Sequence, residues 1–397
     1  MDKQESLAYL EKLEEKGIIL GLERIEKFLS LLGNPERSFK SVHIAGTNGK
    51  GSTAAMLSSI LQQAGYKTGL YTSPHLREFN ERIQVNGKNI QDENFTRLIS
   101  ELKKMKEENN ISLTYFEFTT ALAFKYFAEQ EIDFAVVEVG VGGRLDATNV
   151  IRPEACAITN ISLEHQAHLG NTLEKIAYEK AGIVKEGIPL ITTEQNPNVL
   201  EIFKKICEEK NSKLIILDKP FEGNLPLPGK HQQWNAVLAI EVAKQLGLSK
   251  KDIEKGLAVA HWPARFEIIQ KKCPIVLDVA HNPAGAKVLA ETITTKFPGK
   301  KVLLVLGVAS GKEMAGIAKQ LAPLAEKVFV CTPEFRGMKL SQTLENVKQF
   351  NSNAISFQSV GEAVSKAIEE CEGIVVVCGS HFTVGEALES LSTHKNE

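Results

Sequence analysis

The segment from His43 to Thr53 (HIAGTNGKGST) constrains the fold more than any other part of this 397-residue chain. It lies between a short apolar run and a helical pattern, where a phosphate-binding loop lies in an α/β protein. Its glycines let backbone N–H groups converge on an anion, and the start of the helix adds partial positive charge. The segment therefore predicts nucleotide binding by Gly46, Thr47, Asn48, Gly49, Lys50, Gly51 and Ser52.

Within this segment, Lys50 is placed to reach the β- and γ-phosphates, and the Ser52 hydroxyl is placed to bind magnesium. The loop departs from a strict Walker A motif because Gly51 separates Lys50 from Ser52. A glycine-rich turn alone could be purely structural. The lysine and hydroxyl residues at the strand-to-helix junction favour a nucleotide, although the loop does not identify the base.

The rest of the chain alternates short apolar runs with amphipathic stretches, which is typical of a mostly parallel sheet. A first series of runs is followed by a proline-containing irregular segment, residues 218–229, and a helix at 231–246. A second series begins after Arg265. We therefore expect an α/β fold, with a P-loop-type domain at 1–264 and a smaller Rossmann-like domain at 265–397. The predicted strands are residues 41–45, 68–72, 133–139, 155–160, 188–193, 275–279, 302–306, 327–331 and 374–378.

Composition excludes several classes of function. The 47 Lys and Arg residues nearly balance the 49 Asp and Glu residues, so no overall charge favours nucleic acid or an acidic membrane. Six scattered cysteines lack a Cys-x-x-Cys pair and suit free thiols in a reducing compartment. The N-terminus is charged, and no apolar run approaches membrane-spanning length. We expect a cytoplasmic protein without nucleic-acid or membrane partners.

A second chemical signal is Glu138, at the end of the predicted strand 133–139. Open α/β sheets bind ligands at the carboxyl ends of their strands, and a carboxylate there suits magnesium. A single glutamate at such a position could equally be structural or solvated.

A series of motifs distributed over nearly the whole chain resembles the folylpolyglutamate synthase/dihydrofolate synthase family of the Mur ligase superfamily. Any one of these motifs would be weak evidence, whereas the complete set in this order is specific. The motifs are HIAGTNGKGST, TSPHLREFNERIQVNG (72–87), FEFTTALAF (116–124), EVGVGGRLDATN (138–149), EKAGIVK (179–185), GKHQQWNA (229–236), WPARFE (262–267) and DVAHNP (278–283).

The resemblance implies ATP and Mg²⁺ as cofactors, and a role for each matching residue. Ser52, Ser73 and Glu138 would hold one magnesium ion, and His165 would bind a second that shares Glu138. Lys180 would be carbamylated, and Asp146 would lie at the pterin end of the acid substrate. Asn235 would support the adenine, Asp278 would bind the ribose, His281 would lie against the base or phosphates, and Arg265 would reach the γ-phosphate when the domains close.

Other interpretations of these residues remain. Taken singly, His165 could be a core or capping residue, Asp146 a turn residue, Arg265 a surface residue, and Lys180 a helix-surface lysine paired with Glu179 or another acid. The chain also departs from the family pattern at three positions. Glu164 replaces the commoner aspartate, Ala264 stands where glycine is usual before the arginine, and Val279 replaces another glycine.

The implied reaction joins a carboxylic acid, dihydropteroate or a folate, to the amine of L-glutamate through an acyl phosphate made from ATP. Lys50, His165, Lys180 and Arg265 are the predicted catalytic residues. A cell-wall Mur ligase is disfavoured because only about 45 residues precede the phosphate loop, fewer than a typical domain needs. A P-loop regulator that hydrolyses nucleotide slowly is disfavoured by the second α/β domain bearing DVAHNP.

Overall fold

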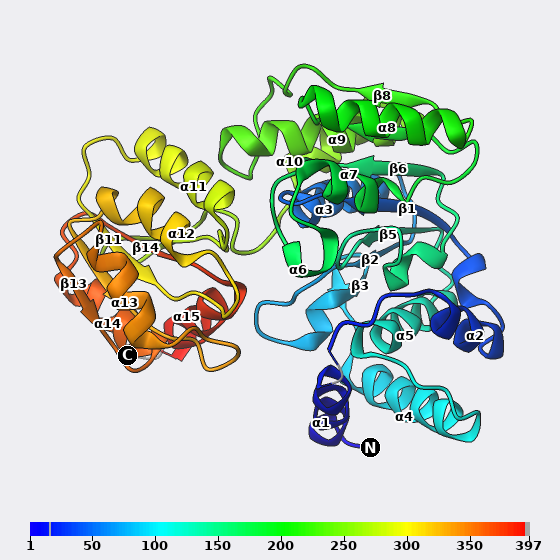
Figure 1. The fold of residues 1–397 in the computed structure, drawn as a ribbon, viewed down its shortest axis with the longest axis horizontal. Coiled ribbons are helices and arrows are strands. Elements are labelled where there is room, and N and C mark those ends of the chain that lie inside the picture. The colour runs from blue at the N-terminus through cyan, green and yellow to red at the C-terminus, as the bar shows by residue number, and fades with distance from the viewer. Residues whose placement is uncertain (16, 394–397) are drawn as a thin grey trace. The chain divides into compact units, whose positions relative to one another are not determined.

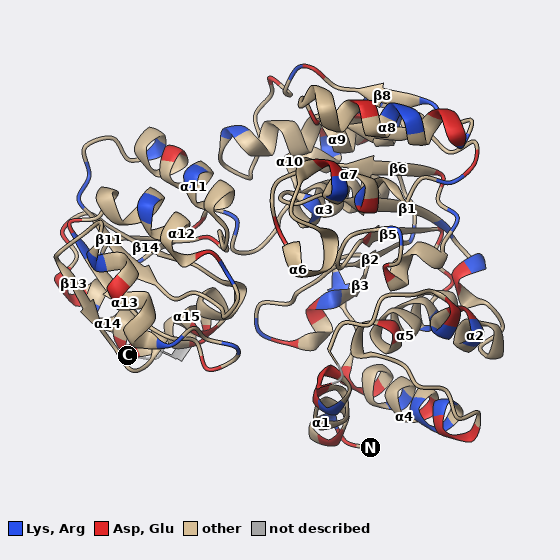
Figure 2. Ribbon diagram, viewed as in Figure 1, with Lys and Arg blue, Asp and Glu red and all other residues tan. Residues whose placement is uncertain are grey.

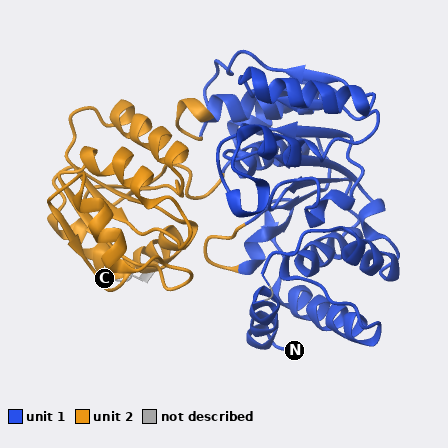
Figure 3. Cartoon of the chain, viewed as in Figure 1, with its two compact units in different colours: residues 1–73, 79–226, 232–261 blue, residues 74–78, 227–231, 262–397 orange. Residues whose placement is uncertain are grey.

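The computed structural model describes residues 1–15 and 17–393, which form two compact α/β units (Figures 1 and 3). The first unit comprises Met1–Ser73, Phe79–Pro226 and Gln232–His261. The second comprises Pro74–Glu78, Leu227–His231 and the chain from Trp262 onward. Two short segments that precede Trp262 in the sequence thus belong to the second unit.

The first unit is built on an eight-stranded sheet with the order β4-β3-β2-β5-β1-β6-β7-β8. The central strands β1, β5 and β6 pair in parallel and are buried at every position except Lys40, as expected for strands covered by helices on each side. The strands β3 and β4 add an antiparallel edge. The strands are β1 (Lys40–Ala45), β2 (Thr68–Tyr71), β3 (Ile83–Val85), β4 (Lys88–Asn89), β5 (Phe134–Glu138), β6 (Ala155–Ile158), β7 (Leu190–Thr192) and β8 (Leu214–Ile216).

Helices cover this sheet and bury two large apolar clusters, one that includes residues of α1, α2, α4 and α5 and one that includes residues of α7 and α8. The helix α10 packs closely on α3 because Gly256 has no side chain; a Cβ there would collide with the backbone of Ile60. The helices are α1 (Lys3–Glu14), α2 (Glu23–Leu31), α3 (Lys50–Gln63), α4 (Asp92–Glu108), α5 (Tyr115–Glu129), α6 (Gln166–Leu169), α7 (Leu173–Ala181), α8 (Pro197–Glu209), α9 (Lys230–Gln245) and α10 (Lys250–Ala258).

The second unit has a six-stranded sheet with the order β13-β12-β11-β14-β10-β9, in which only β9 is antiparallel to its neighbour. Its core is dominated by valine, leucine and isoleucine from the parallel strands. The elements are β9 (Glu267–Gln270), β10 (Pro274–Leu277), α11 (Pro283–Lys296), β11 (Val302–Leu306), α12 (Met314–Leu321), β12 (Lys327–Val330), α13 (Leu340–Lys348), β13 (Ala354–Ser356), α14 (Val360–Glu370), β14 (Ile374–Cys378) and α15 (His381–Thr393).

The segment Pro74–Glu78 joins the second unit through contacts with α15. Leu76 packs against the apolar core, and Arg77 lies 3.8 Å from Glu389. Gly385 permits this approach, since a Cβ there would collide with the carbonyl oxygen of Leu76.

The predicted fold class is confirmed, and the predicted strands all occur within two residues of their expected ends. The irregular segment 218–229 contains no helix or strand. The sequence analysis missed β3, β4, β8, β9 and β13, which are short and are partly polar or lie at sheet edges.

The expectation of six free thiols is wrong for one pair of cysteines. Cys273, in the turn before β10, forms a disulfide with Cys371, which follows α14. The two residues are 98 positions apart, so no local motif could indicate their pairing. The other four cysteines are free and buried.

Acidic and basic side chains are intermixed along helices such as α4 and α8 (Figure 2). Among the residues that the structure describes, no helix has both the length and the apolar character needed to cross a membrane.

Candidate active site

Four adjacent parallel strands of the first unit, in the order β2-β5-β1-β6, end at one edge of the sheet. The phosphate loop follows β1, Ser73 follows β2, Glu138 ends β5, and the segment containing His165 follows β6. The topology therefore brings together segments that are far apart in sequence, because the carboxyl ends of parallel strands share one edge.

The phosphate loop adopts a backbone that requires glycine at two positions. Gly46 has φ +139° and Gly49 has φ +91°, and Gly49 immediately precedes α3. Asn160, in the segment after β6, fixes the loop: its side chain accepts from the N–H of Asn48 at 3.2 Å and donates to the Asn48 carbonyl at 2.9 Å. The first N–H groups of α3 have no acceptor within the helix and can bind an anion.

Two lysines meet at the carbonyl oxygen of Gly46. Lys50 Nζ donates to this oxygen and to the Thr47 carbonyl, both at 3.1 Å, and Lys180 Nζ donates to the Gly46 carbonyl at 2.7 Å. Two amino groups on one carbonyl concentrate positive charge at the phosphate loop. The charge of Lys180 is balanced by Glu164, so the amino group of Lys50 is the one that favours binding of a polyanion such as a triphosphate.

Lys180 is buried, which excludes the interpretation of a helix-surface lysine. Its Nζ lies 2.7 Å from Glu164 Oε1, whereas Glu179 pairs instead with Arg144 at 2.8 Å. Burial lowers the pKa of Lys180 to about 8, although the charge of Glu164 opposes this shift. Burial alone would raise the pKa of Glu164, but the charges of Lys180 and Lys50 outweigh it and lower the pKa to about 2.

Glu138 and Ser73 lie together at the ends of neighbouring strands. Glu138 is buried, and its Oε2 accepts the backbone N–H of Ser73 at 3.1 Å. This hydrogen bond joins the segment after β2 to the carboxylate that ends β5. It places two of the four predicted metal ligands side by side.

The third predicted ligand, Ser52, contacts a residue that the sequence analysis missed. Gln232 Nε2 lies 3.3 Å from Ser52 Oγ, and Gln232 Oε1 accepts from Asn235 Nδ2 at 2.9 Å. Asn235 in turn lies against the phosphate loop, since a Cβ on Gly49 would collide with its side chain. Gln232 and Asn235 are three positions apart on α9, so helical spacing could have indicated their common face.

His165, the fourth predicted ligand, is exposed and precedes α6 in the left-handed conformation, with φ +45°. The described part of the chain holds no cluster of three or more His, Cys, Asp or Glu side chains arranged to bind a metal. The predicted set contains only Glu138 and His165 from those residue types. Its other members, Ser52 and Ser73, supply hydroxyl groups.

Asp146 organises its own loop. Its Oδ1 accepts the N–H of Thr148 at 3.0 Å and its Oδ2 accepts the N–H of Val141 at 2.8 Å. Burial raises the pKa of Asp146, and the hydrogen bonds that it accepts oppose that shift. The loop is also fixed to α7, because the N–H of Arg144 donates to the Glu179 carbonyl at 2.7 Å.

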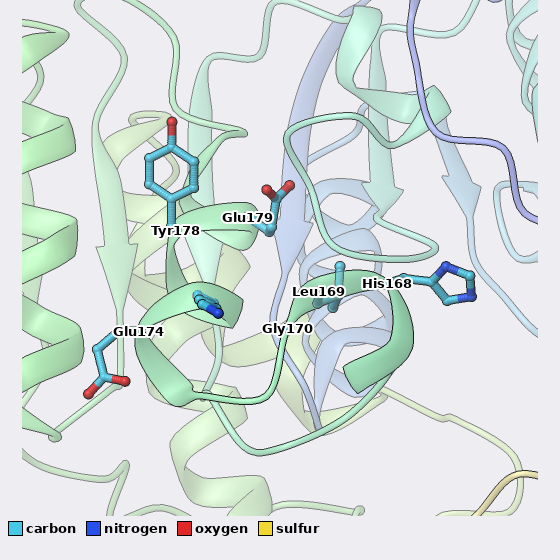
Figure 4. A pocket seen from close by; sticks show the side chains of 7 residues that line it. His168, Leu169, Gly170, Glu174, Tyr178 and Glu179 are labelled. Carbon is cyan, nitrogen blue, oxygen red and sulfur yellow. The ribbon is translucent and has the colours of Figure 1, made fainter.

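A hollow with a volume of about 420 Å³ lies beside α6 and α7 (Figure 4). Tyr178 and Glu179 line it from α7, and Leu169 and Gly170 line it where the chain leaves α6. Glu179 immediately precedes Lys180, so this hollow adjoins the helix that carries the buried lysine.

The second unit brings its own predicted residues together. Arg265 Nη2 lies 3.5 Å from His381 Nε2, and the rings of His281 and His381 have centroids 5.4 Å apart. Asp278 accepts the N–H groups of Phe266 at 2.9 Å and Ala280 at 2.8 Å. Burial raises the pKa of Asp278, against the opposing charge of Arg265. The sequence analysis gave His381 no role.

The backbone at Ala264 has a φ of +55°, in the left-handed region that glycine adopts most readily. The alanine keeps this backbone conformation at some cost in strain, and the next residue, Arg265, is still placed beside His381.

Comparisons with known proteins match both halves of the chain. Residues 44–217 match the Mur ligase middle domain, and residues 264–381 match the Mur ligase glutamate ligase domain. A dihydrofolate synthase/folylpolyglutamate synthase of Bacillus subtilis (strain 168) is 35% identical, over 94% of this chain and 96% of that protein. The chain belongs to the folylpolyglutamate synthase/dihydrofolate synthase family of Mur ligases.

Solved structures of this Mur ligase family share the fold over the full length. E. coli FolC in complex with DHPP and ADP is 33% identical with a TM-score of 0.91, over 100% of this chain and 99% of that one. The bifunctional enzyme of Yersinia pestis, complexed with AMPPNP and a manganese ion, is 30% identical with a TM-score of 0.88, over 99% and 98% of the two chains.

Proposed function

We infer that this protein is an ATP-dependent ligase that adds L-glutamate to folates and to dihydropteroate. The observation that carries the inference is the match, over almost the whole chain, to a dihydrofolate synthase/folylpolyglutamate synthase. Lys50 supports it, because its amino group lies at the carbonyl oxygens of Gly46 and Thr47 and places a positive charge where a polyphosphate would bind. The ADP and AMPPNP bound to the related enzymes identify ATP as the nucleotide.

The proposed reaction proceeds through an acyl phosphate. A carboxylate oxygen of the acid attacks the γ-phosphorus of ATP, and the bond to the ADP oxygen breaks. The amine of L-glutamate then attacks the activated carbonyl carbon and loses a proton, and inorganic phosphate leaves from the tetrahedral intermediate. Lys50 and Arg265 stabilise the charge that spreads over the transferring group.

A divalent metal fits the residues at the strand ends. Ser52, Ser73 and Glu138 provide the oxygen donors that magnesium prefers, and Glu138 is already directed toward Ser73 by a 3.1 Å hydrogen bond. The manganese ion in the Yersinia pestis enzyme supports a divalent cation. When bound, the ion would neutralise charge on the β- and γ-phosphates. We propose that His165 contributes to a second site that shares Glu138.

We propose the following contacts with the acid substrate and with the nucleotide. Asp146 and its loop would face the pterin end of the acid, and Asn235 would support the adenine. Asp278 would bind the ribose and His281 would lie against the base or phosphates. These assignments divide the chain into a nucleotide-binding domain at 1–264 and a C-terminal domain at 265–397. We also propose that the enzyme acts as a cytoplasmic monomer without nucleic-acid partners.

We further propose that Lys180 is carbamylated. Reaction requires the neutral amine to attack CO₂ with loss of one proton, and burial favours the neutral amine by lowering the pKa to about 8. The product is an anion on α7 close to Glu164, the residue before His165, and these groups together would form a set of donors suited to a cation. Glu164, the residue that replaces the family's usual aspartate, reaches the amine at 2.7 Å.

The Lys180→Ala substitution is expected to remove most of the ligase activity, about 10- to 100-fold, because it deletes the anion that the carbamate supplies. Added acetate or formate should restore part of the activity by occupying the vacated space. Lys175→Ala, at an exposed position on the same helix, serves as the control and should show neither effect.

A ¹³C NMR spectrum of the wild-type protein under ¹³CO₂ should show a carbamate signal that Lys180→Ala lacks. A Lys180→Ala protein with wild-type activity would contradict the proposal, as would a wild-type protein without the carbamate signal.

The function itself is tested by coupled measurement of ADP release from ATP and Mg²⁺, with dihydropteroate or tetrahydrofolate, each with and without L-glutamate. We expect release that depends on both the acid and glutamate. Release at the same rate without glutamate would indicate a nucleotide-hydrolysing regulator and would contradict the ligase assignment.

A further inference from the structure

Three buried polar side chains link the strand before the phosphate loop to the loop after β5. His43 Nε2 lies 2.8 Å from Thr148 Oγ1, and Thr148 Oγ1 lies 2.5 Å from Asp146 Oδ1. His43 and Thr148 are fully buried, and Asp146 is 3% exposed. Neither His43 nor Thr148 takes part in the reaction described above.

The hydrogen bonds that Asp146 accepts determine which atom is the donor in each contact between His43, Thr148 and Asp146. Both carboxylate oxygens of Asp146 accept backbone N–H groups, which is the arrangement of an ionised carboxylate. An ionised carboxylate cannot donate, so the single hydroxyl proton of Thr148 points to Asp146. The Thr148 oxygen must then accept from His43, which carries its proton on Nε2.

The neutral state of His43 agrees with its surroundings. Burial lowers the pKa of His43 to about 3, so the ring is uncharged at neutral pH. Its Nδ1 is buried without a hydrogen-bond partner in the structure, as expected for a ring whose only proton is used at Nε2.

These hydrogen bonds fix the position of the Asp146 loop relative to the strand before the phosphate loop. His43 lies on β1, three residues before Gly46 and the phosphate loop. At the other end, Asp146 precedes the short 3₁₀ helix Ala147–Val150 and accepts a hydrogen bond from the N–H of Val141. The loop that holds Asp146 is thereby fixed to the strand that leads into the phosphate loop.

We propose that His43 and Thr148 are positioning residues, which act through the carboxylate of Asp146 to hold the loop 140–149 in the conformation that receives the acid substrate. The inference rests on the proposed function, because it takes the Asp146 loop to face that substrate. It adds the requirement that the hydroxyl group of Thr148, rather than its size, sets the affinity for the acid.

Thr148 offers a matched pair of variants. Thr148→Val keeps the shape of the side chain but removes both links, whereas Thr148→Ser keeps the hydroxyl and removes a methyl group. Loss of a hydrogen bond to a charged group should raise the KM for dihydropteroate or tetrahydrofolate by about tenfold or more in Thr148→Val. The KM for ATP should stay within about twofold, and Thr148→Ser should restore the KM for the acid to near the wild-type value.

Steady-state ADP release with each substrate varied in turn, together with thermal unfolding of each variant, tests the proposal. Equal KM values for the acid in Thr148→Val and Thr148→Ser would overturn it, and so would parallel increases in the KM for the acid and for ATP. Should Thr148→Val fail to fold, His43→Leu removes the donor at the other end, and an unchanged KM for the acid in that variant would overturn the proposal.

The same assay separates this inference from the proposed function. A wild-type protein without glutamate-dependent ADP release would refute the function and the inference together. An active wild-type protein whose Thr148→Val variant matches Thr148→Ser would refute only the positioning role.

Discussion

Lys50→Ala and Glu138→Ala should each abolish glutamate ligation, with losses on the order of 10²- to 10³-fold or more. Lys50 donates to the carbonyl oxygens of Gly46 and Thr47 and therefore lies where a triphosphate would bind. Glu138 is held beside Ser73 at the end of β5. Both side chains act on charge at the phosphates, so their removal should affect the reaction far more than the packing of the sheet.

The measurement is glutamate-dependent ADP release by the purified variants, with thermal unfolding recorded for each. Lys88→Ala provides the control, because Lys88 is an exposed lysine on the edge strand β4. It should keep wild-type activity, with a melting temperature within about 2 °C of the wild-type value. Wild-type turnover in Lys50→Ala or Glu138→Ala would show that the phosphate and metal assignments are wrong.

Arg265→Ala should lower kcat by about 10³-fold or more, while the Kd for ATP changes by no more than about threefold. Arg265 lies beside His381 and its charge opposes the rise in the pKa of Asp278. We propose that it reaches the γ-phosphate only when the domains close. An interaction made only in that state stabilises the transition state more than the ground state, so its loss appears in kcat.

Single-turnover kinetics and equilibrium binding of ATP separate the two effects. Lys300→Ala, at an exposed position of the second unit, is the control and should match the wild-type protein in both measurements. A collapse of ATP affinity with unchanged kcat in Arg265→Ala would identify Arg265 as a ground-state contact.

The elements that could be predicted from the sequence are those with strong local signals. The strands Val302–Leu306 and Ile374–Cys378 are buried at every position, and both were predicted with their observed ends. The strand β4 has only two residues, both exposed, and β9 alternates half-buried and exposed residues at an edge. Such strands form because a neighbouring strand provides hydrogen-bond partners. The local sequence does not show where that neighbouring strand will lie.

The same distinction applies to the candidate site. The roles of Lys50 and Ser52 were predicted from the spacing of the loop, that of Glu138 from its place at the end of a strand, and that of Lys180 from a motif of the family. The partnership of Lys180 with Glu164, sixteen residues away, depends on how α7 meets the segment after β6. Likewise, no motif joins His43 to Thr148, which are 105 residues apart and meet because β1 pairs with both β5 and β6, the strands that flank Thr148 in the sequence.

The central claim is that the acid is activated by phosphoryl transfer from ATP before glutamate attacks it. Dihydropteroate labelled with ¹⁸O in its carboxylate, incubated with the enzyme, ATP, Mg²⁺ and L-glutamate, tests this claim directly through the mass of the phosphate released. Because the bridging oxygen of the acyl phosphate leaves with phosphorus, we expect one ¹⁸O atom in the phosphate for each amide bond formed. Unlabelled phosphate, released with or without amide formation, would contradict the account.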